Sequence, residues 1–499
     1  RFSLAMGRGD VRRAKEYITQ GLILSLSLTI PFAIFIRFFA HDYLAFFGAD
    51  ESVTILAAKY LSWFYLVPIS EGLLQLAQSL ICAEGDIRRY YCAFCVFVIT
   101  FLSLTYFGIT CGFSLAACSA AIVIAEFLAL LILLTHLFAK SNNLGLVRHC
   151  SFSDARKIVS TSFGDAAARL CTALLIVLIT KLVVFRFGSE MLPILQIVIL
   201  LLALTDLFEG IGASVQPLVT VYQGEDNPRG VRLVMRSAIV ASLVLSGAVV
   251  LVLETFPTLV GRLLGLSDPV LIAESAHAVR IFVPFIVAMS LAGLFNSYYM
   301  CIEHSLWAIL VSVFAYFLFP LAAALVGSVF AADGLWFGLA AGVYLGLGSA
   351  ALAILLRSKR GEFPLLLNRR RERRITSYTL RLSDESVVGV STAVGELLKR
   401  RGADALRASL LIEEALLVIR DRNAPKSVLA EVTVERGAEL QITLRDDGEI
   451  FDLTDADAEI KSLRGFVVAS LMEKQLNRLN LITTGFNRNV FRSPSPCCR

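Results

Sequence analysis

Charged residues are scarce in this chain. Asp, Glu, Lys and Arg make up 17% of its 499 residues, hydrophobic residues make up 57%, and the mean hydropathy is +0.72. Soluble domains carry about 25% charged residues, so this composition excludes an ordinary soluble protein and predicts a chain that crosses the lipid bilayer many times. The net charge is only +5, and the cations cluster beside apolar segments, which gives no reason to expect a nucleic-acid partner.

Sequence motifs for metal binding and for ATP-driven work are also missing. The ten cysteines are scattered, mostly within apolar segments, and do not show metal-ligand spacing. Cys92 and Cys95 have the CxxC spacing, but they begin an apolar segment, where small buried residues explain them better. No Walker-A glycine loop occurs in the sequence. We therefore expect a transporter rather than an enzyme, with no catalytic residues, no metal site, no required cofactor and no use of ATP as its energy source.

Ten apolar stretches are each long enough, at roughly 20 residues, to cross the core of a bilayer. They are Gly21–Phe39, Leu61–Cys82, Tyr91–Thr110, Leu115–Phe138, Ala166–Phe187, Leu192–Tyr222, Val234–Phe256, Ala276–Cys301, Leu306–Phe330 and Leu335–Leu356. The sequence therefore predicts an all-α polytopic membrane protein over this part of the chain.

Positive charges alternate between the loops that join these stretches. One set of loops carries Arg8, Arg12, Arg13, Lys15, Arg88, Arg89, Lys140, Arg148, Arg156, Lys157, Arg229, Arg232, Arg236 and the run Arg357–Arg374, whereas the other set holds Lys59, Arg186 and Arg262. Because cytoplasmic loops carry an excess of cations, the first set is expected in the cytoplasm. The sequence thus predicts a protein of the cytoplasmic (inner) membrane, with its C-terminal region in the cytoplasm.

An internal repeat relates the two halves of the apolar region. Landmarks recur at spacings of 216 to 219 residues, in the pairs Gly7 and Gly224, Gly48 and Gly265, Pro68 and Pro284, and Cys82 and Cys301. A near-constant spacing predicts two copies of one membrane unit. Two apolar stretches precede Gly224 in the second copy, but only six residues precede Gly7. We therefore expect a fragment whose full-length form has about two more helices upstream.

Several short motifs within the repeat resemble a known family of transporters. They are Gly7-Arg8-Gly9-Asp10, Phe47-Gly48-Ala49-Asp50, Ala83-Glu84-Gly85-Asp86, and Gly210-Ile211-Gly212 followed by Gln216-Pro217, Tyr222 and Gly224. In order and spacing they resemble multidrug and toxic compound extrusion (MATE) transporters over about residues 1–357. The resemblance implies two six-helix lobes around a central cavity, here residues 1–138 and 161–356 joined by a loop at 139–160. It also implies exchange of a substrate against Na⁺ or H⁺.

Ionisable residues within the apolar stretches are candidates for ion or substrate coupling, because a charge in hydrocarbon costs about 3 kcal/mol or more unless it faces a cavity or a partner. Asp206 and Glu209 are three residues apart and share a helix face. Next to them, Gly210, Gly212 and Pro217 are expected to break the helix and free backbone carbonyls. The alternative is that one of these carboxylates pairs with Lys181 or Arg169 and simply locks the lobe together.

A second polar stripe lies in the first copy of the repeat. Glu71, Gln75 and Gln78 fall on roughly one helix face, either lining a cavity or joining a buried hydrogen-bond network, and Asn296 is a related candidate in the second copy. Pro68 and Pro284 are expected to kink their helices and act as hinges. Some relatives keep coupling aspartates in helices that are absent or uncharged here, so these residues do not support a proton site in the N-terminal lobe.

The composition changes sharply after Leu356. Residues 357–374 form a cation-rich linker, residues 375–492 predict a soluble α+β domain, and residues 493–499 form a tail. Expected strands are Tyr378–Leu382, Val428–Glu435 and Leu440–Arg445, and expected helices are Ser386–Arg401, Asp404–Arg420 and Gly465–Glu473.

Two stretches of this domain resemble GHKL-type ATPases of the serine-kinase branch that includes anti-sigma factors. They are the helix Leu411–Val418 and the loop Arg445–Asp452. The resemblance implies that Asp446 accepts a hydrogen bond from the adenine amino group, that Gly448 lets the backbone approach the base, and that Glu414 is the acid of the helix. Val418 stands where the family has a magnesium-binding asparagine, and Gly465 is a single glycine in the lid. We therefore expect a degenerate domain with its kinase activity lost, which binds a nucleotide such as ATP without metal or binds a regulatory protein. Alternatively, Asp446-Asp447-Gly448 is only a hairpin turn.

These observations predict an antiporter-type exporter of drugs or small organic metabolites, fused to a regulatory domain. Two other functions remain open. An exporter of lipid-linked sugars would need a cavity lined by many cations. A membrane sensor that transports nothing would show a sealed, apolar interior without a cavity around Asp206, Glu209 and Glu71.

Overall fold

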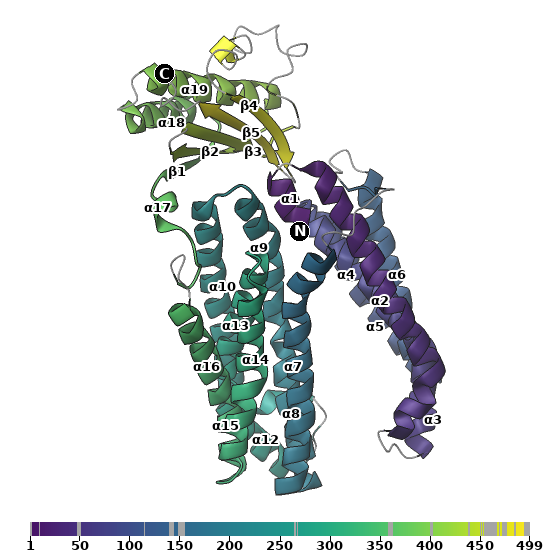
Figure 1. Cartoon of the computed structure of the whole chain (residues 1–499). Coiled ribbons are helices and arrows are strands. Elements are labelled where there is room, and N and C mark those ends of the chain that lie inside the picture. The colour runs from purple at the N-terminus through teal and green to yellow at the C-terminus, as the bar shows by residue number, and fades with distance from the viewer. Residues whose placement is uncertain are drawn as a thin grey trace. The chain divides into compact units, whose positions relative to one another are not determined.

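The computed structural model describes most of the chain (Figure 1). The described residues are 2–8, 10–46, 51–113, 115–138, 144–147, 155–263, 266, 268–357, 363–399, 403–437, 440–449, 451, 453, 467–468, 470–471, 477–483 and 486–493. The chain divides near residues 150 and 370. We call residues 2–147 the first bundle, residues 155–368 the second bundle and residues 371–493 the C-terminal domain.

All regular secondary structure among the described residues of the first bundle is helical. Its helices are α1 (Phe2–Arg8), α2 (Val11–Phe46), α3 (Glu51–Phe64), α4 (Val67–Ala83), α5 (Ile87–Thr110), α6 (Ala116–Leu134) and the short 3₁₀ turn η1 (Thr135–Phe138). The helix α6 packs against α3, α4 and α5, and α2 packs against α4.

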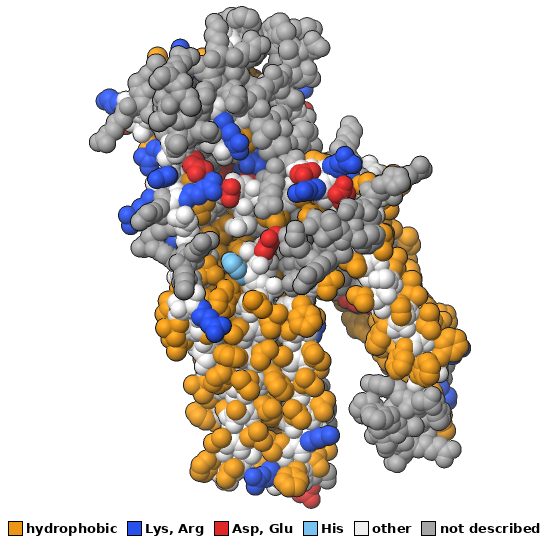
Figure 2. Space-filling model, in the orientation of Figure 1, with side chains coloured by type: hydrophobic (Ala, Val, Ile, Leu, Met, Phe, Trp, Pro, Cys, Tyr) orange, Lys and Arg blue, Asp and Glu red, His pale blue; other side chains and the backbone are white. Residues whose placement is uncertain are grey.

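The second bundle contains a larger set of helices. They are α7 (Ala155–Phe187), η3 (Ser189–Met191), α8 (Leu192–Leu204), α9 (Asp206–Gly224), α10 (Pro228–Thr255), α11 (Thr258–Leu263), α12 (Pro269–Phe282), α13 (Phe285–Cys301), α14 (Ser305–Val313), the π-helical turn η4 (Phe314–Leu318), α15 (Phe319–Gly327) and α16 (Ala332–Arg357). Figure 2 shows hydrophobic side chains along the middle of each bundle on the visible face, as expected of helices that contact lipid.

The structure supports eight to ten of the ten predicted spans. Among the described residues, eight helices are long and apolar enough to cross a membrane, and the number rises to ten if each of two bent helix pairs is one span. Ala58–Phe64 and Val67–Ala83 meet at 40°, and Pro269–Phe282 and Phe285–Cys301 meet at 48°. The bends lie beside Pro68 and Pro284, where kinks are predicted, because proline removes a backbone donor and crowds the preceding turn.

Helix starts repeat between the two bundles. The Oδ1 atom of Asp10 accepts a hydrogen bond from the backbone N–H of Arg13 at 3.1 Å, at the start of α2. In the second bundle, Oδ1 of Asn227 accepts from the backbone N–H of Gly230, also at 3.1 Å, at the start of α10. Both donors and both acceptors are 217 residues apart, so the same side-chain cap begins the corresponding helix in each copy.

Close helix approaches also recur at matching positions. A Cβ atom added to Gly108 of α5 would lie 2.8 Å from Cβ of Ala117 in α6. A Cβ atom added to Gly327 of α15 would lie 1.9 Å from the carbonyl oxygen of Gly334 in α16. The glycines are separated by 219 residues and their partners by 217, so each bundle joins its last two spans through a glycine contact at the same place.

Residues 363–368 belong structurally to the second bundle, although they follow its last span. The hydroxyl of Tyr298 donates to the carbonyl of Leu365 at 2.6 Å, and the hydroxyl of Tyr299 donates to the carbonyl of Pro364 at 2.9 Å. Both tyrosines are buried, and Leu365 and Leu367 pack with side chains of α10, α13 and α16. The segment is therefore held against the end of α13.

The C-terminal domain is built from a sheet and two long helices. Its elements, after the short helix α17 (Arg369–Glu372), are β1 (Ile375–Arg381), α18 (Asp384–Leu397), α19 (Ala403–Asn423), β2 (Leu429–Arg436), β3 (Leu440–Asp446), β4 (Asn477–Thr483) and β5 (Phe486–Ser493). Within the described residues, the strands form one antiparallel sheet in the order β1-β2-β3-β5-β4. The predicted helix Gly465–Glu473 lies mostly outside the described residues.

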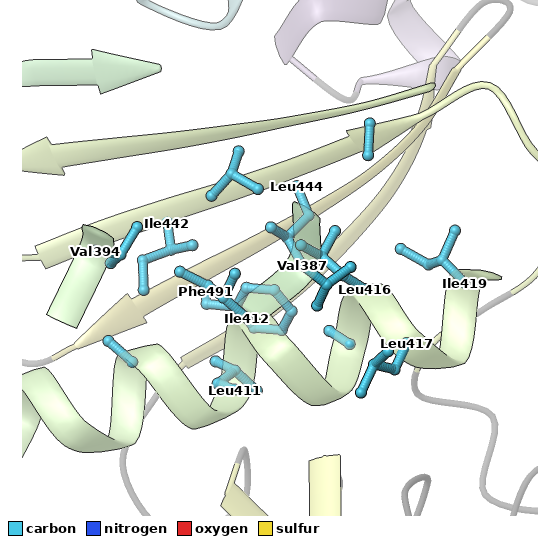
Figure 3. Packing of buried hydrophobic residues seen from close by; sticks show 14 of the residues in the cluster. Val387, Val394, Leu411, Ile412, Leu416, Leu417, Ile419, Ile442, Leu444 and Phe491 are labelled. Carbon is cyan, nitrogen blue, oxygen red and sulfur yellow. The ribbon is translucent and has the colours of Figure 1, made fainter. Parts of the chain in front are cut away.

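The core of this domain lies between the sheet and its helices. Figure 3 shows Ile412 and Leu416 of α19 beside Ile442, Leu444 and Phe491 of β3 and β5. Alternate residues of each strand point to the same face, so β3 and β5 bury one apolar row under the helices. The predicted mixed α and β content of this region is confirmed.

Replacing Gly346 by alanine should destabilise the second bundle. The added Cβ would lie 2.2 Å from the carbonyl oxygen of Phe314, so α16 must move away from η4 at a cost of about 1–3 kcal/mol. Gly348 is a matched control on the same helix, since a Cβ there meets no atom within 4 Å. Thermal unfolding in detergent should show a lower midpoint for Gly346→Ala than for Gly348→Ala, and equal midpoints would contradict the close packing.

Candidate functional site

The acidic pair predicted from the sequence begins α9. The helix α8 ends at Leu204, Thr205 follows, and Asp206 and Glu209 occupy the first turn of α9. The two helices nevertheless form one apolar span, Leu192–Gly224. The interruption lies before the acids in the sequence.

The predicted helix break at Gly210, Gly212 and Pro217 is wrong. The helix α9 continues through all three residues to Gly224. Gly212 instead lets α9 approach α13, since a Cβ there would lie 2.8 Å from the hydroxyl oxygen of Ser297. Pro217 is accommodated within the helix, as prolines in membrane helices often are when neighbouring groups compensate for the lost hydrogen bond.

A pocket of about 320 Å³ opens beside the acidic pair. It lies between α7, α8, α9, α13 and η4, and most of its lining side chains are apolar. Its polar lining residues include Arg169, Thr172, Asp206, Glu209, Ser290 and Tyr316. A mostly apolar cavity with a few convergent polar groups is the usual form of a small-molecule site.

An ion pair crosses this pocket. A guanidinium nitrogen of Arg169 on α7 donates to a carboxylate oxygen of Glu209 at 2.7 Å. The Arg169 side chain is 62% exposed and the Glu209 side chain is 50% exposed. The pairing with Arg169 that the sequence left as an alternative is therefore present, but it lies in a cavity. Asp206 adds a second carboxylate, so the described lining carries two carboxylates and one cation.

The other candidates of the second bundle lie elsewhere. Lys181 is exposed on α7 and does not line the pocket. Asn296 is 4% exposed, and its Oδ1 accepts a hydrogen bond at 3.2 Å from the hydroxyl of Ser312, which also contacts the carbonyl of Gly164. Asn296 thus joins three helices in a buried network.

The polar stripe of the first bundle includes a residue that the sequence reasoning missed. In α4, Nε2 of Gln75 donates to Oε1 of Glu71 at 2.7 Å, whereas Gln78 is half-buried one turn further along. Glu126 of α6 is 2% exposed, and its carboxylate accepts a hydrogen bond from the hydroxyl of Ser70. The signal was present in the sequence, because Glu126 is the single carboxylate of an apolar stretch of 23 residues.

The motif at the end of α4 forms a polar cluster that joins three elements. Nδ1 of His136 in η1 lies 2.8 Å from Oδ2 of Asp86, Nε2 of His136 lies 3.5 Å from Oε2 of Glu84, and Arg89 of α5 also binds Asp86. Burial alone would raise the pKa of Asp86, but its hydrogen bonds with His136 and Arg89 lower it below the ordinary value. Asp86 is thus held ionised, and the cluster ties α4 to α5 and η1.

The C-terminal domain brings Asp446 and Gly448 together with two asparagines. Oδ1 of Asp446 accepts hydrogen bonds from Nδ2 of Asn487 at 2.8 Å and from the backbone N–H of Gly448 at 3.1 Å. Asn423, at the end of α19, accepts from the backbone N–H of Glu449 at 2.7 Å. A Cβ atom at Gly448 would lie 2.6 Å from Nδ2 of Asn423, so a larger residue there would have to displace the Asn423 side chain.

Acceptor oxygens in this cluster point into the interior. Asp446 is 1% exposed, and its Oδ2 has no hydrogen-bond partner among the described residues. The same holds for Oδ1 of Asn487 and of Asn489. Buried acceptors without a partner are rare in proteins, and each one needs an explanation, such as an ordered water molecule. Asp446-Asp447-Gly448 is not a hairpin turn, because β3 pairs with β2 and β5, and β4 lies beyond β5.

The remaining residues predicted to bind a nucleotide are Glu414 and Gly465. Glu414 is half-buried on α19, and Val418 packs in the apolar core of the domain, where it offers no oxygen to a cation. Gly465 lies outside the described residues. Within the described part of the chain, no group of three or more His, Cys, Asp and Glu side chains is arranged to hold a metal ion.

Asp446→Asn should stabilise the C-terminal domain at neutral pH. Burial raises the pKa of Asp446, although hydrogen bonds from Asn487 and Gly448 partly lower it. The folded state therefore holds this proton more tightly than the unfolded state, and the contribution of Asp446 to stability falls as pH rises from its ordinary pKa of 3.8 through the raised value. Hydrogen exchange of the β3 and β5 amides in the whole protein should become slower in Asp446→Asn, and less dependent on pH. The exposed Glu396→Gln is the control, and faster exchange in Asp446→Asn would contradict this account.

Comparisons with known proteins agree with this architecture. The MatE family model matches residues 1–107 and 166–326, which is more than half of the chain. No curated protein matches the sequence. Among solved structures, MATE in complex with MaL6 is 18% identical with a TM-score of 0.65, and the match covers 71% of this chain and 82% of that one. An outward-facing multidrug resistance MATE family transporter of the MOP superfamily is 18% identical with a TM-score of 0.64, over 71% and 83%.

A third structure comes from the same superfamily. A MOP superfamily transporter from Pyrococcus furiosus, described as having a binding pocket of reverse polarity, is 17% identical with a TM-score of 0.65, over 71% of this chain and 82% of that one. Identities this low show a shared fold, and the family model shows the membership. The chain is a multi-pass membrane protein and belongs to the MATE family of transporters.

Proposed function

We propose that the protein is a secondary active exporter, which exchanges drugs or small organic metabolites against Na⁺ or H⁺ across the cytoplasmic (inner) membrane. The observation that carries this proposal is the pocket around Asp206, Glu209 and Arg169 within a MATE fold. Ionisable residues within membrane spans mark ion and substrate pathways, because they are otherwise too costly to keep. The sequence has no Walker-A loop, so an ion gradient is the energy source.

The composition of the pocket favours this substrate class over the two alternatives. Arg169 is the one cation among the described lining residues, whereas a lipid-linked sugar phosphate would call for several. The cavity beside Asp206 and Glu209 also argues against a sensor with a sealed interior. Apolar walls with Met289, Phe208 and Tyr316 suit an organic molecule that carries little charge.

The exchange of substrate for an ion would arise because both interact with the carboxylates of the pocket. Glu209 has Arg169 as an ion-pair partner in the described state, and Asp206 stands in the same wall. A proton or Na⁺ that neutralises one carboxylate changes the charge that a substrate meets in the pocket. Binding of ion and substrate are then linked through one set of charges, and linkage of this kind is reciprocal.

The C-terminal domain is the regulatory part of this proposal. Asp446, Gly448 and Asn487 would receive the adenine of a nucleotide such as ATP, since a buried carboxylate oxygen without a partner suits an amino-group donor. Val418 removes the usual oxygen ligand for magnesium, so binding would not need the metal. The domain lies in the cytoplasm, where it senses a nucleotide or binds a regulatory protein without hydrolysing ATP.

Substitution of the pocket acids tests the exporter. Proteoliposomes should accumulate a fluorescent cationic dye under an imposed proton or sodium gradient, and Asp206→Asn and Glu209→Gln should each reduce this gradient-driven uptake because they remove an ionisable partner. Glu190→Gln, an exposed acid in the loop after α7, is the matched control and should transport normally. Unchanged coupling in both pocket variants would remove these residues from the site.

Titration with nucleotides tests the C-terminal domain. The whole protein in detergent should bind ATP equally with and without Mg²⁺, and Asp446→Asn should weaken binding about 5- to 100-fold, the equivalent of a buried hydrogen bond worth about 1–3 kcal/mol. GTP should bind poorly, since guanine places an oxygen where adenine has its amino group. Equal affinity of wild type and Asp446→Asn would exclude Asp446 from the pocket.

A further inference from the structure

Arg280 is an exposed cation within a membrane span. It belongs to α12, the first half of the bent span 269–301, and lies four residues before Pro284. The hydroxyl of Tyr344, at the middle of α16, donates to the carbonyl oxygen of Pro284 at 2.6 Å. The bend is therefore close to the middle of the membrane. Because four helical residues extend about 6 Å, the backbone of Arg280 lies inside the hydrocarbon core.

The described residues offer no partner to Arg280. None of their hydrogen bonds or ion pairs involves it, and it does not line the pocket of the second bundle. On the same helix, Glu274 is six residues away, or about 9 Å along the axis. A guanidinium at this depth is costly unless an anion or water reaches it. Its compensation must therefore come from outside the described part of the chain.

An acid lies beside Arg280 where α12 packs on α16. Nε2 of His277, three residues before Arg280, is 3.1 Å from Oδ2 of Asp333 at the start of α16. The His277 and Asp333 side chains are each 60% exposed. Within the described structure, the second carboxylate oxygen of Asp333 makes no hydrogen bond. We call Arg280, His277 and Asp333 the α12–α16 cluster, which presents one unpaired cation next to one accessible carboxylate.

The surface around the α12–α16 cluster is apolar. Val270 of α12 is 62% exposed, and Phe337 and Leu345 of α16 are 66% and 55% exposed. Exposed apolar side chains on membrane helices contact lipid, so acyl chains border the cluster. Side chains of a helix lean toward its N-terminus, which for α12 is the end of the span at Pro269. The long side chain of Arg280 therefore extends from the hydrocarbon core toward the lipid headgroups.

We propose that the α12–α16 cluster binds a phospholipid with a phosphoethanolamine headgroup, with the phosphate on Arg280 and the ammonium on Asp333. A guanidinium presents parallel N–H donors that fit two phosphate oxygens. A carboxylate accepts hydrogen bonds from a primary ammonium group, whereas a choline headgroup has no N–H to donate. A headgroup with a net negative charge would face Asp333 without a compensating cation. One acyl chain of the bound lipid runs over the exposed ring of Phe337.

The bound lipid adds a contact between α12 and α16 beside the bend at Pro284. Tyr344 already joins the two helices at this bend, and the headgroup joins them again one to two turns further out. Lipid binding therefore favours the packing of α12 on α16 that the structure describes. Because neither Arg280 nor Asp333 lines the pocket, this site does not depend on the exported substrate or on the proposed exporter function.

Brominated lipids, which quench tryptophan fluorescence on contact, locate this site. Trp336 follows Asp333 by three residues, and in a protein with Trp63→Phe and Trp307→Phe it is the one tryptophan left. In mixed bilayers, brominated phosphatidylethanolamine should quench Trp336 with a binding constant about 5-fold above those of brominated phosphatidylcholine and phosphatidylglycerol, the factor expected of one charged contact at the headgroup level. Equal constants for the three lipids, or a preference for phosphatidylglycerol, overturn the proposal.

Substitutions separate the two ends of the headgroup. Arg280→Gln should lower the constant for phosphatidylethanolamine about 5-fold, and Arg280→Lys, which keeps the charge, should retain most of it. Asp333→Asn should abolish the preference for phosphatidylethanolamine over phosphatidylcholine. Arg262→Gln, an exposed cation of α11, is the matched control and should leave the preference unchanged. A preference that persists in Arg280→Gln or in Asp333→Asn, with circular dichroism equal to wild type, overturns the assignment of that residue and with it the proposal.

Soluble headgroup analogues distinguish a lipid from a free ion. Inorganic phosphate and phosphoethanolamine in the buffer should leave the quenching of Trp336 unchanged, because neither has an acyl chain to cover Phe337. Relief of quenching by either compound would show that the α12–α16 cluster is a site for a soluble phosphate and would overturn the lipid assignment.

Discussion

The cost of a charged or polar group in hydrocarbon is the constraint on which the rest of this structure depends. Every backbone group within the lipid must find a partner inside its own span, so the membrane part of the chain is helical. Three side chains within the spans show how a polar group can be compensated there. Arg169 meets Glu209 across a cavity, Asn296 is joined to Ser312 in a buried network, and Glu126 accepts from Ser70. Few charges therefore remain within the spans of the bundles.

Duplication supplied the scaffold, whereas the charges differ between its copies. Each copy begins a helix with a side-chain cap, at Asp10 and at Asn227. Each copy also brings two helices together at a glycine, at Gly108 and at Gly327. The acids are not repeated in this way, since Glu71 corresponds to Val287 when the spacing of Pro68 and Pro284 is applied. Packing sites therefore recur in both copies, whereas the carboxylates within the spans do not.

Hydropathy, glycine and proline predicted most of the membrane architecture. The ten spans could be read from the sequence because apolar length is a direct requirement of the bilayer. Pro68 and Pro284 lie beside bends, but α9 continues as a helix through Pro217, since neighbouring groups can compensate for a lost backbone hydrogen bond. The order of strands in the C-terminal sheet could not be predicted, because β5 pairs with β3 across the 39 residues that separate them.

The candidate site was predicted only in part, for reasons of geometry. Asp206 and Glu209 were recognisable as costly charges, but the pocket beside them is formed by residues of α7, α8, α9, α13 and η4, which are distant in sequence. Arg169 could be named as a partner, but the sequence did not decide between it and Lys181, which lies 12 residues, or about 18 Å, further along α7. Glu126 was overlooked because its partner Ser70 is distant in sequence and becomes informative only when α4 and α6 are packed together.

Tyr298 and Tyr299 at the end of α13 would move with that helix if it rotated about the bend at Pro284. Tyr298 lies about 14 residues beyond Pro284, or about 20 Å along the axis at 1.5 Å per residue, so a swing of about 10° at the bend carries the tyrosines through roughly 4 Å. Their hydroxyls donate hydrogen bonds to the carbonyls of Pro364 and Leu365, in the segment that leads to the C-terminal domain. Met289 and Ser290 of α13 also line the pocket. A rotation of α13 that changes the shape of the pocket would therefore also displace the segment that leads to the C-terminal domain.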